Sequence, residues 1–380
     1  MKGLFKIISS LVIGCVIGVL IVVPIVALIN GESVSSVLST FLSERLLRLL
    51  IVIPVAILAI ILQLIIHEGG HLVAGLLTGY RFVSFRFLNF TLIQKDGRLQ
   101  WRNYDLAGTG GQCLLAPPDK SYDQIDTRWY NAGGVLANIL FSILGIILLI
   151  AFDMPVWLKV FWGVMVFIGL YYAITNGIPM KLSGMANDGY YLFHMEKNNA
   201  DKRYFLNILK SNALNQEGLQ PKDMPEDLYE LPEQHGDWKD PLYVGNRITS
   251  VSRLMNLHQW EEAYQQLTEM LRNKNDIMPL YVDEINCMMT ILCIAMGRDE
   301  EAKRYYDKTT TNYVNQHAPT QSDKRLVKFA AALAFDNDRL EAEKIYNGLL
   351  ADRDKFIHQG DVAMTIDLMQ HLLDCRNAKA

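Results

Sequence analysis

Long apolar runs in the first half of the chain alternate with short polar connections. Each run is long enough to cross the roughly 30 Å hydrocarbon core of a bilayer as a helix. The runs are Ile7–Ile29, Leu49–Ile66, Ala132–Phe152 and Val160–Met180, and the second continues to residue 77. Beyond Asn198 charged residues become frequent, and apolar residues recur at helical spacing. The pattern predicts four membrane spans followed by a soluble helical domain.

The periodicity changes between the second and third spans. The stretch Arg81–Trp101 is rich in Phe, Val, Thr and Ile in partial alternation, and Asp96-Gly97 is a hairpin turn signal. We therefore expect a β-hairpin close to the membrane. The glycine-rich AGTGG at 107–111 lacks the lysine of a phosphate-binding loop, so we expect a turn there.

The soluble half contains a recurring helical pattern. Three segments align on Ala263, Ala302 and Ala342, with a period of about 40 residues, and apolar residues follow each alanine at helical spacing. A small residue early in the second helix of a pair allows close packing, and such pairs stack into a solenoid. The pattern resembles tetratricopeptide helix pairs, although its period exceeds the roughly 34 residues of that repeat. A plain helical bundle is the alternative.

These elements predict an all-α membrane protein with four transmembrane helices, a small β-hairpin between spans two and three, and a tetratricopeptide-like soluble domain. The N-terminal span and its loop are expected at 1–44. The membrane core follows at 45–200, with spans at 49–77, 132–152 and 160–180. A proline-rich, acidic linker is expected at 201–241, and the helical repeats at 242–380.

The charge distribution adds an orientation. The chain is 51% hydrophobic and 20% charged, with a formal net charge of −4, which argues against bulk nucleic-acid binding. Lys and Arg are concentrated between spans two and three and are rare in the opposite loops. The positive-inside rule then predicts that the N-terminus, this segment and the C-terminal half are cytoplasmic. A bacterial cell membrane is the expected location.

The second span carries the sequence HEGGH at 67–71. Ionisable side chains at membrane depth are costly, so they mark a functional site by default. His67 and His71 share one helix face and can present both imidazoles to one Zn²⁺, while Glu68 beside them can accept a proton from water. This pattern is typical of a zinc hydrolase.

A catalytic zinc needs a third protein ligand. Asp188, in NGIPMKLSGMANDG at 176–189, is the candidate, because a fourth span that runs from outside to inside brings this segment to the same membrane side as His67. Asn187 is a poor zinc ligand, and Glu196 is the alternative. The remaining histidines have no ligand spacing and are expected to be surface or packing residues.

Three motifs together resemble the site-2-protease family of intramembrane zinc metalloproteases over about residues 45–195. They are HEGGH at 67–71, AGGVLAN at 132–138, and Asn176-x-x-Pro179 followed by Asp188-Gly189. The segment between Pro179 and Asp188 is longer than is usual in the family. The resemblance implies that zinc is bound by His67, His71 and Asp188, and that Glu68 activates the water. It also implies that Asn138 and Asn176 hydrogen-bond the substrate backbone or the oxyanion; for Asn138 an interhelical hydrogen bond is the alternative.

The resemblance implies a zinc endopeptidase that hydrolyses a peptide bond in or near a transmembrane segment, close to the cytoplasmic face. The substrate would be a membrane protein or a signal-peptide remnant. The repeats would recruit substrate or a protein partner, or regulate access. The hairpin around Phe82–Trp101 would act as a gate or as an edge for an unwound substrate. Membrane lipid is the other expected partner, and no nucleic acid is expected.

Two other interpretations remain. A catalytically inactive membrane scaffold would use the same fold to hold a partner through the repeats, although such a scaffold has no need of Glu68 in lipid. A prenyl-peptide-processing zinc protease is the third interpretation, and the Asn-x-x-Pro and Asp-Gly signature disfavours it.

Overall fold

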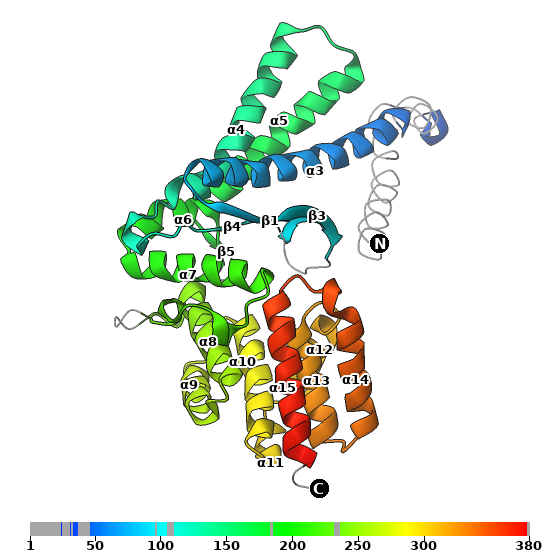
Figure 1. The fold of residues 1–380 in the computed structure, drawn as a ribbon. Helices are drawn as coiled ribbons and strands as arrows, with labels where there is room; N and C mark the ends of the chain where they lie inside the picture. The colour runs from blue at the N-terminus through cyan, green and yellow to red at the C-terminus, as the bar shows by residue number, and fades with distance from the viewer. Residues whose placement is uncertain are drawn as a thin grey trace. The chain divides into compact units, whose positions relative to one another are not determined.

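The computed structural model describes residues 24, 31, 33–36, 46–95, 97–104, 110–182, 185–231 and 236–377 (Figure 1). The chain is mostly helical. Three segments are long and apolar enough to cross a membrane, Val52–Leu77, Tyr122–Ala151 and Val156–Gly177. They correspond to the second, third and fourth predicted spans. The first predicted span, Ile7–Ile29, lies outside the described residues except for residue 24.

The helices of the membrane segments begin and end within a few residues of the predicted spans. They are α3 (Leu46–Leu77), α4 (Arg128–Ala151) and α5 (Val156–Gly177), and the single turn η2 (Tyr122–Gln124) precedes α4. The chain divides into two compact units, one of residues 1–62 with 141–168 and the other of residues 63–140 with 169–380. All the candidate site residues lie in the second unit.

A four-stranded antiparallel sheet replaces the single hairpin expected between the second and third spans. The β2–β3 hairpin turns at Gly97, which has a positive φ of 72° and lies at the expected turn position. The strands are β1 (Arg81–Phe87), β2 (Phe90–Lys95), β3 (Arg98–Asn103) and β4 (Gly111–Ala116), in the order β3-β2-β1-β4. The expected turn at 107–111 is wrong at Gly111, which begins β4. The pairing of β4 with β1 skips two strands, and local periodicity cannot indicate such a pairing.

The described residues of the segment 201–241, which was expected to be a linker, are largely folded into a helix and short turns; residues 232–235 lie outside the described part. Most of its first part belongs to α7 (Asn199–Gln216), whose N-cap Asn198 accepts hydrogen bonds from two backbone amides of the first turn. Two single turns follow, η4 (Pro221–Asp223) and η5 (Glu226–Leu228). Arg253 donates to three backbone carbonyls of this stretch at 2.8–3.2 Å. The predicted linker is therefore corrected: prolines and acids here punctuate short turns that are held against α8 (Pro241–Asn256).

The C-terminal part is a series of helix pairs (Figure 1). Ala263, Ala302 and Ala342, the three aligned alanines, are each 0% exposed and lie in α9, α11 and α14, the second helix of each pair. The sequence pattern thus identified the close packing points, while the tetratricopeptide-like assignment stays a prediction. The helices are α8, α9 (Trp260–Arg272), α10 (Pro279–Ala295), α11 (Asp299–Ala302), α12 (Lys308–His317), α13 (Ser322–Ala334), α14 (Arg339–Asp352) and α15 (Gln359–Asn377), with the turn η6 (Arg353–Lys355).

Candidate metal centre

Two histidines one helical turn apart face each other near the end of α3. His67 and His71 are each 7% exposed, and their Nε2 atoms lie 3.2 Å apart. The helical repeat places positions i and i+4 on one face, and the α3 helix is continuous through HEGGH. The local sequence alone is enough to bring these two imidazoles together.

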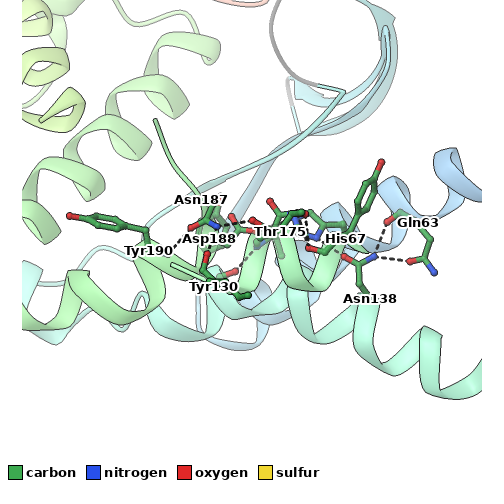
Figure 2. Close-up of polar contacts among 12 residues, drawn as sticks. Gln63, His67, Tyr130, Asn138, Thr175, Asn187, Asp188 and Tyr190 are labelled. Atoms are coloured by element: carbon green, nitrogen blue, oxygen red, sulfur yellow. Dashed lines mark hydrogen bonds and ion pairs between the residues drawn. The ribbon is translucent and has the colours of Figure 1, made fainter. Parts of the chain in front are cut away.

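The other ring nitrogen of each histidine is held by an oxygen that can only accept a hydrogen bond. His71 Nδ1 lies 2.6 Å from the carbonyl oxygen of Tyr130, and His67 Nδ1 lies 2.7 Å from Asn138 Oδ1 (Figure 2). Both Nδ1 atoms therefore carry the proton, and both Nε2 atoms present lone pairs to the same point. Protein zinc sites orient their histidines through outer partners of this kind.

Asn138 owes its orientation to α3. Its side chain is 0% exposed, and Nδ2 donates to the backbone oxygen and to Oε1 of Gln63 at 3.1 and 2.7 Å (Figure 2). The Oδ1 atom is thereby directed at His67. The structure places Asn138 behind the imidazole, in the interhelical position that was the alternative to contact with substrate.

Asp188 completes the group. Its Oδ2 lies 3.1 Å from His67 Nε2 and 3.3 Å from His71 Nε2, and this oxygen is buried with no hydrogen-bond partner. Zinc bonds of about 2.0–2.2 Å in a tetrahedral site place ligand atoms about 3.3–3.6 Å apart. The observed separations are close to that range. Three ligand atoms that carry no proton and face one point repel one another unless a cation lies between them. The residues present therefore fit a metal ion, and among the described residues they are the group that could hold one.

The charge state of Asp188 agrees with this arrangement. Burial acts to raise the pKa of the Asp188 carboxyl, but positive charge on the facing imidazoles of His71 and His67, when they are protonated, outweighs burial and holds that pKa well below its usual range; a bound cation would supply positive charge at the same place. The carboxyl is thus an anion at neutral pH, as a metal ligand must be.

The described residues of the long gap between Pro179 and Asp188 form a short local pairing. Two two-residue strands, β5 (Lys181–Leu182) and β6 (Met185–Ala186), pair within it, and Asp188 begins helix α6 (Asp188–His194). The side chain of Asn187 joins the two ends of the gap by four hydrogen bonds of 2.6–3.1 Å, to Met180 N, Tyr190 N, Thr175 O and Ile178 O. The extra residues therefore do not displace Asp188 (Figure 2). The sequence marked Asn187 only as a poor ligand, and its positioning role was missed.

Glu68 points toward the sheet rather than into the helix bundle. A Cβ atom built on Gly111, the first residue of β4, would lie 2.8 Å from Glu68 Oε1. The same strand is tied to α4, because the Tyr130 hydroxyl donates to the carbonyl of Cys113 at 2.8 Å. The strand next to the predicted general base is therefore β4, an edge strand of the sheet.

The glycines of the second motif make room for the ligands. A Cβ on Gly134 would lie 2.5 Å from His71 Nε2 and 2.7 Å from His67 Cε1. A Cβ on Gly70 would lie 2.2 Å from the carbonyl oxygen of Gly133, so α3 and α4 touch through their backbones. The motif AGGVLAN was visible in the sequence, but this steric role became clear only from the packing.

The two glycines inside HEGGH should respond differently to the same substitution. Gly70→Ala forces α3 away from α4 and should lower stability by about 1–3 kcal/mol or more, with loss of bound metal. Gly69→Ala meets nothing within 4 Å and should leave both properties near the wild-type values. Thermal unfolding and metal content of the detergent-purified variants measure the difference. Equal behaviour of the two variants would contradict the close approach of the helices.

The other predicted site residues make their side-chain hydrogen bonds outside the ligand group. Asn176 Nδ2 donates to the Tyr172 carbonyl of its own helix at 3.0 Å. Glu196, the alternative ligand, accepts from the backbone N and Oγ1 of Thr127 at 3.1 and 2.9 Å and pairs with Lys202 at 2.9 Å. The structure thus groups Asp188, and not Glu196, with the histidines.

Comparisons with protein-family models, curated proteins and solved structures find no match to this chain. The chemistry must therefore be argued from the site itself.

Proposed function

We propose that this protein is a membrane-embedded zinc endopeptidase. The observation that carries the proposal is the convergence of two histidine Nε2 atoms and the unpartnered Asp188 Oδ2, with both Nδ1 atoms held by acceptors. Glu68 stands next to this group, on a helix apolar enough to cross a membrane. The sequence resemblance to site-2 proteases supports the same reaction class.

The residues of the site would have separate roles in hydrolysis. His67, His71 and Asp188 would hold the ion, and bound zinc supplies a Lewis acid that polarises a carbonyl and acidifies water. Glu68 would accept a proton from the attacking water as its oxygen bonds to the peptide carbonyl carbon. The same carboxyl would then donate that proton to the leaving nitrogen as the C–N bond breaks. The products are a carboxylic acid and an amine, which become a carboxylate and an ammonium by transfer of the remaining proton, and Glu68 returns to its initial state.

The strand β4 is the best candidate for holding the substrate. An extended segment can add to a sheet edge, and the part of β4 that is not buried, Gly111 and Gln112, is the end beside Glu68. The sequence predicted that the hairpin around Phe82–Trp101 supplies that edge or acts as a gate. Because β4 lies next to Glu68, we assign the substrate edge to β4 instead. Strand β1 pairs with β4 along its other edge, and β2 and β3 follow in the sheet.

The cellular arrangement follows from the charge bias. With the sheet and the C-terminal helices on the cytoplasmic side, the scissile bond would lie in or near a transmembrane segment close to that face. The helical repeats would then recruit substrate or a partner protein.

The proposed function is tested by comparing peptide termini in membranes from cells that express wild type or Glu68→Gln. Wild type should create new termini in or beside transmembrane segments, and the variant should not create them while its intact substrate accumulates. An identical set of termini in both samples would overturn the peptidase proposal.

A further inference from the structure

Two adjoining cavities lie among alternate helices of the C-terminal domain, far along the chain from the metal centre. Their volumes are about 210 and about 200 Å³. Each is large enough to hold several waters or an amino-acid side chain. Three acidic residues, Glu284, Asp323 and Asp361, line both cavities and thus lie between or beside the two. We call the two cavities together the acidic cavity.

The first part of the acidic cavity is apolar. Its walls come from α8, α10, α13 and α15, and the unbranched, polarisable methionines among them adapt to varied side chains. Its apolar lining residues include Met255, Met288, Ile291, Leu326, Met364 and Leu368. This part suits an apolar side chain.

The charges in the cavity do not balance. Lys324, 1% exposed, pairs with both Glu284 and Asp323, while Asp361 is held by the Asn215 amide at 2.6 Å. Three carboxylates thus face one ammonium. Burial raises the pKa of the Asp361 carboxyl and the charge of Asp323 adds to that rise, although His358 and Asn215 oppose it. The side chains of Glu284 and Asp323 are 22% and 52% exposed and Asp361 is partly buried, so the negative excess lines a partly solvated wall, where a bound cation would offset it.

Two further polar atoms in the cavity wall lack a partner. Gln321 Oε1 and His358 Nδ1 are buried and make no hydrogen bond in the part of the chain that the structure describes. Buried polar atoms are nearly always paired in native proteins, so unpaired ones need an explanation. An amide oxygen and carboxylates can only accept. The cavity therefore offers acceptors and negative charge beside an apolar pocket, and it needs donors.

We propose that the acidic cavity binds a primary ammonium group that is carried beside an apolar side chain on an extended peptide. The ammonium supplies three donors and the missing positive charge, and the neighbouring side chain enters the methionine-lined part. The group is either a peptide amino terminus or a lysine side chain. This binding does not depend on the metal centre, so it stands or falls separately from the peptidase function.

The test uses the full chain in detergent and short leucine peptides as probes. Four probes vary only the charge: lysyl-leucyl-leucinamide, its N-acetyl form, norleucyl-leucyl-leucinamide with a free amino terminus, and its N-acetyl form. A fifth, N-acetyl-glutamyl-leucyl-leucinamide, carries a negative charge. Binding is measured by ligand-observed NMR against empty micelles. At least one singly cationic probe should bind about tenfold or more tighter than the uncharged one. Binding by the acetylated lysine probe identifies the side chain as the source, and binding by the free-amine norleucine probe identifies the amino terminus.

Variants locate the binding in the cavity. Asp361→Asn should weaken the cationic probe about tenfold or more, and Ser252→Phe, which fills the apolar part, should do so without any change of charge. Gln321→Ala removes an unpartnered acceptor and leaves the packing intact. Glu262→Gln, an exposed carboxylate on α9, is the matched control and should bind like wild type. Thermal unfolding confirms that each variant is folded.

The proposal is overturned if the uncharged or anionic probe binds as tightly as the cationic ones. It also fails if no cationic probe binds wild type up to about 10 mM, or if folded Asp361→Asn and Ser252→Phe both bind like wild type. Because the probes are binding ligands only, none of these outcomes depends on cleavage activity.

Discussion

Purified wild-type protein should carry about one zinc ion per chain, and His67→Ala, His71→Ala and Asp188→Ala should each lose it. Each substitution leaves two protein ligands where a catalytic site has three. The loss of one imidazole also leaves Asp188 Oδ2, already without a hydrogen bond, facing a cavity. Elemental analysis of protein purified in detergent and reconstituted with zinc measures the effect, and thermal unfolding shows whether each variant folds.

Two further variants make this experiment specific. Glu196→Ala removes the carboxylate that was the alternative third ligand and should keep zinc, since Glu196 pairs with Lys202 and Thr127 instead. Glu68→Gln should also keep zinc, because Glu68 is not a ligand. If folded Asp188→Ala retains full zinc, the third ligand lies elsewhere. If reconstituted wild type binds none, the peptidase proposal falls and the membrane scaffold takes its place.

Glu68→Gln should lower the rate of peptide cleavage by about 10²–10⁴-fold, the usual contribution of a positioned general base. Glutamine keeps the size of the side chain and its place beside Gly111 but cannot accept a proton from water. The measurement is single-turnover cleavage of the substrate identified from the membrane termini, using variant protein with full zinc content.

The exposed glutamate of α9 provides the matched control for this prediction. Glu262→Gln makes the same chemical change far along the chain from the site and should cleave at the wild-type rate. A Glu68→Gln enzyme within about threefold of wild type would show that another group accepts the proton, since removal of a general base costs about 10²-fold or more. Such a result would leave the zinc site intact but would remove Glu68 from the mechanism.

The sequence by itself determined those features that depend on neighbours along the chain. Apolar length predicted four spans, and three of them match, close to their predicted bounds, helices that are long and apolar enough to cross a membrane. The spacing of His67 and His71 predicted their shared face. Asp96-Gly97 predicted the turn between β2 and β3, and the aligned alanines predicted the buried contacts of α9, α11 and α14. Helical and strand periods are local properties, so a single sequence displays them.

Apart from the grouping of Asp188 with the two histidines, which the motifs predicted, tertiary structure decided what joins distant segments. His67 and Asn138 are 71 positions apart, and whether Asn138 faces the imidazole or the substrate depends on how Gly70 packs on Gly133. Three other features also depend on contacts between segments that are far apart in the chain. They are the pairing of β4 with β1, the folding of the predicted linker and the acidic cavity. Contacts between segments that are far apart in sequence produce no periodic pattern of residues. Their complementary shape and hydrogen-bond geometry arise only when the folded elements meet.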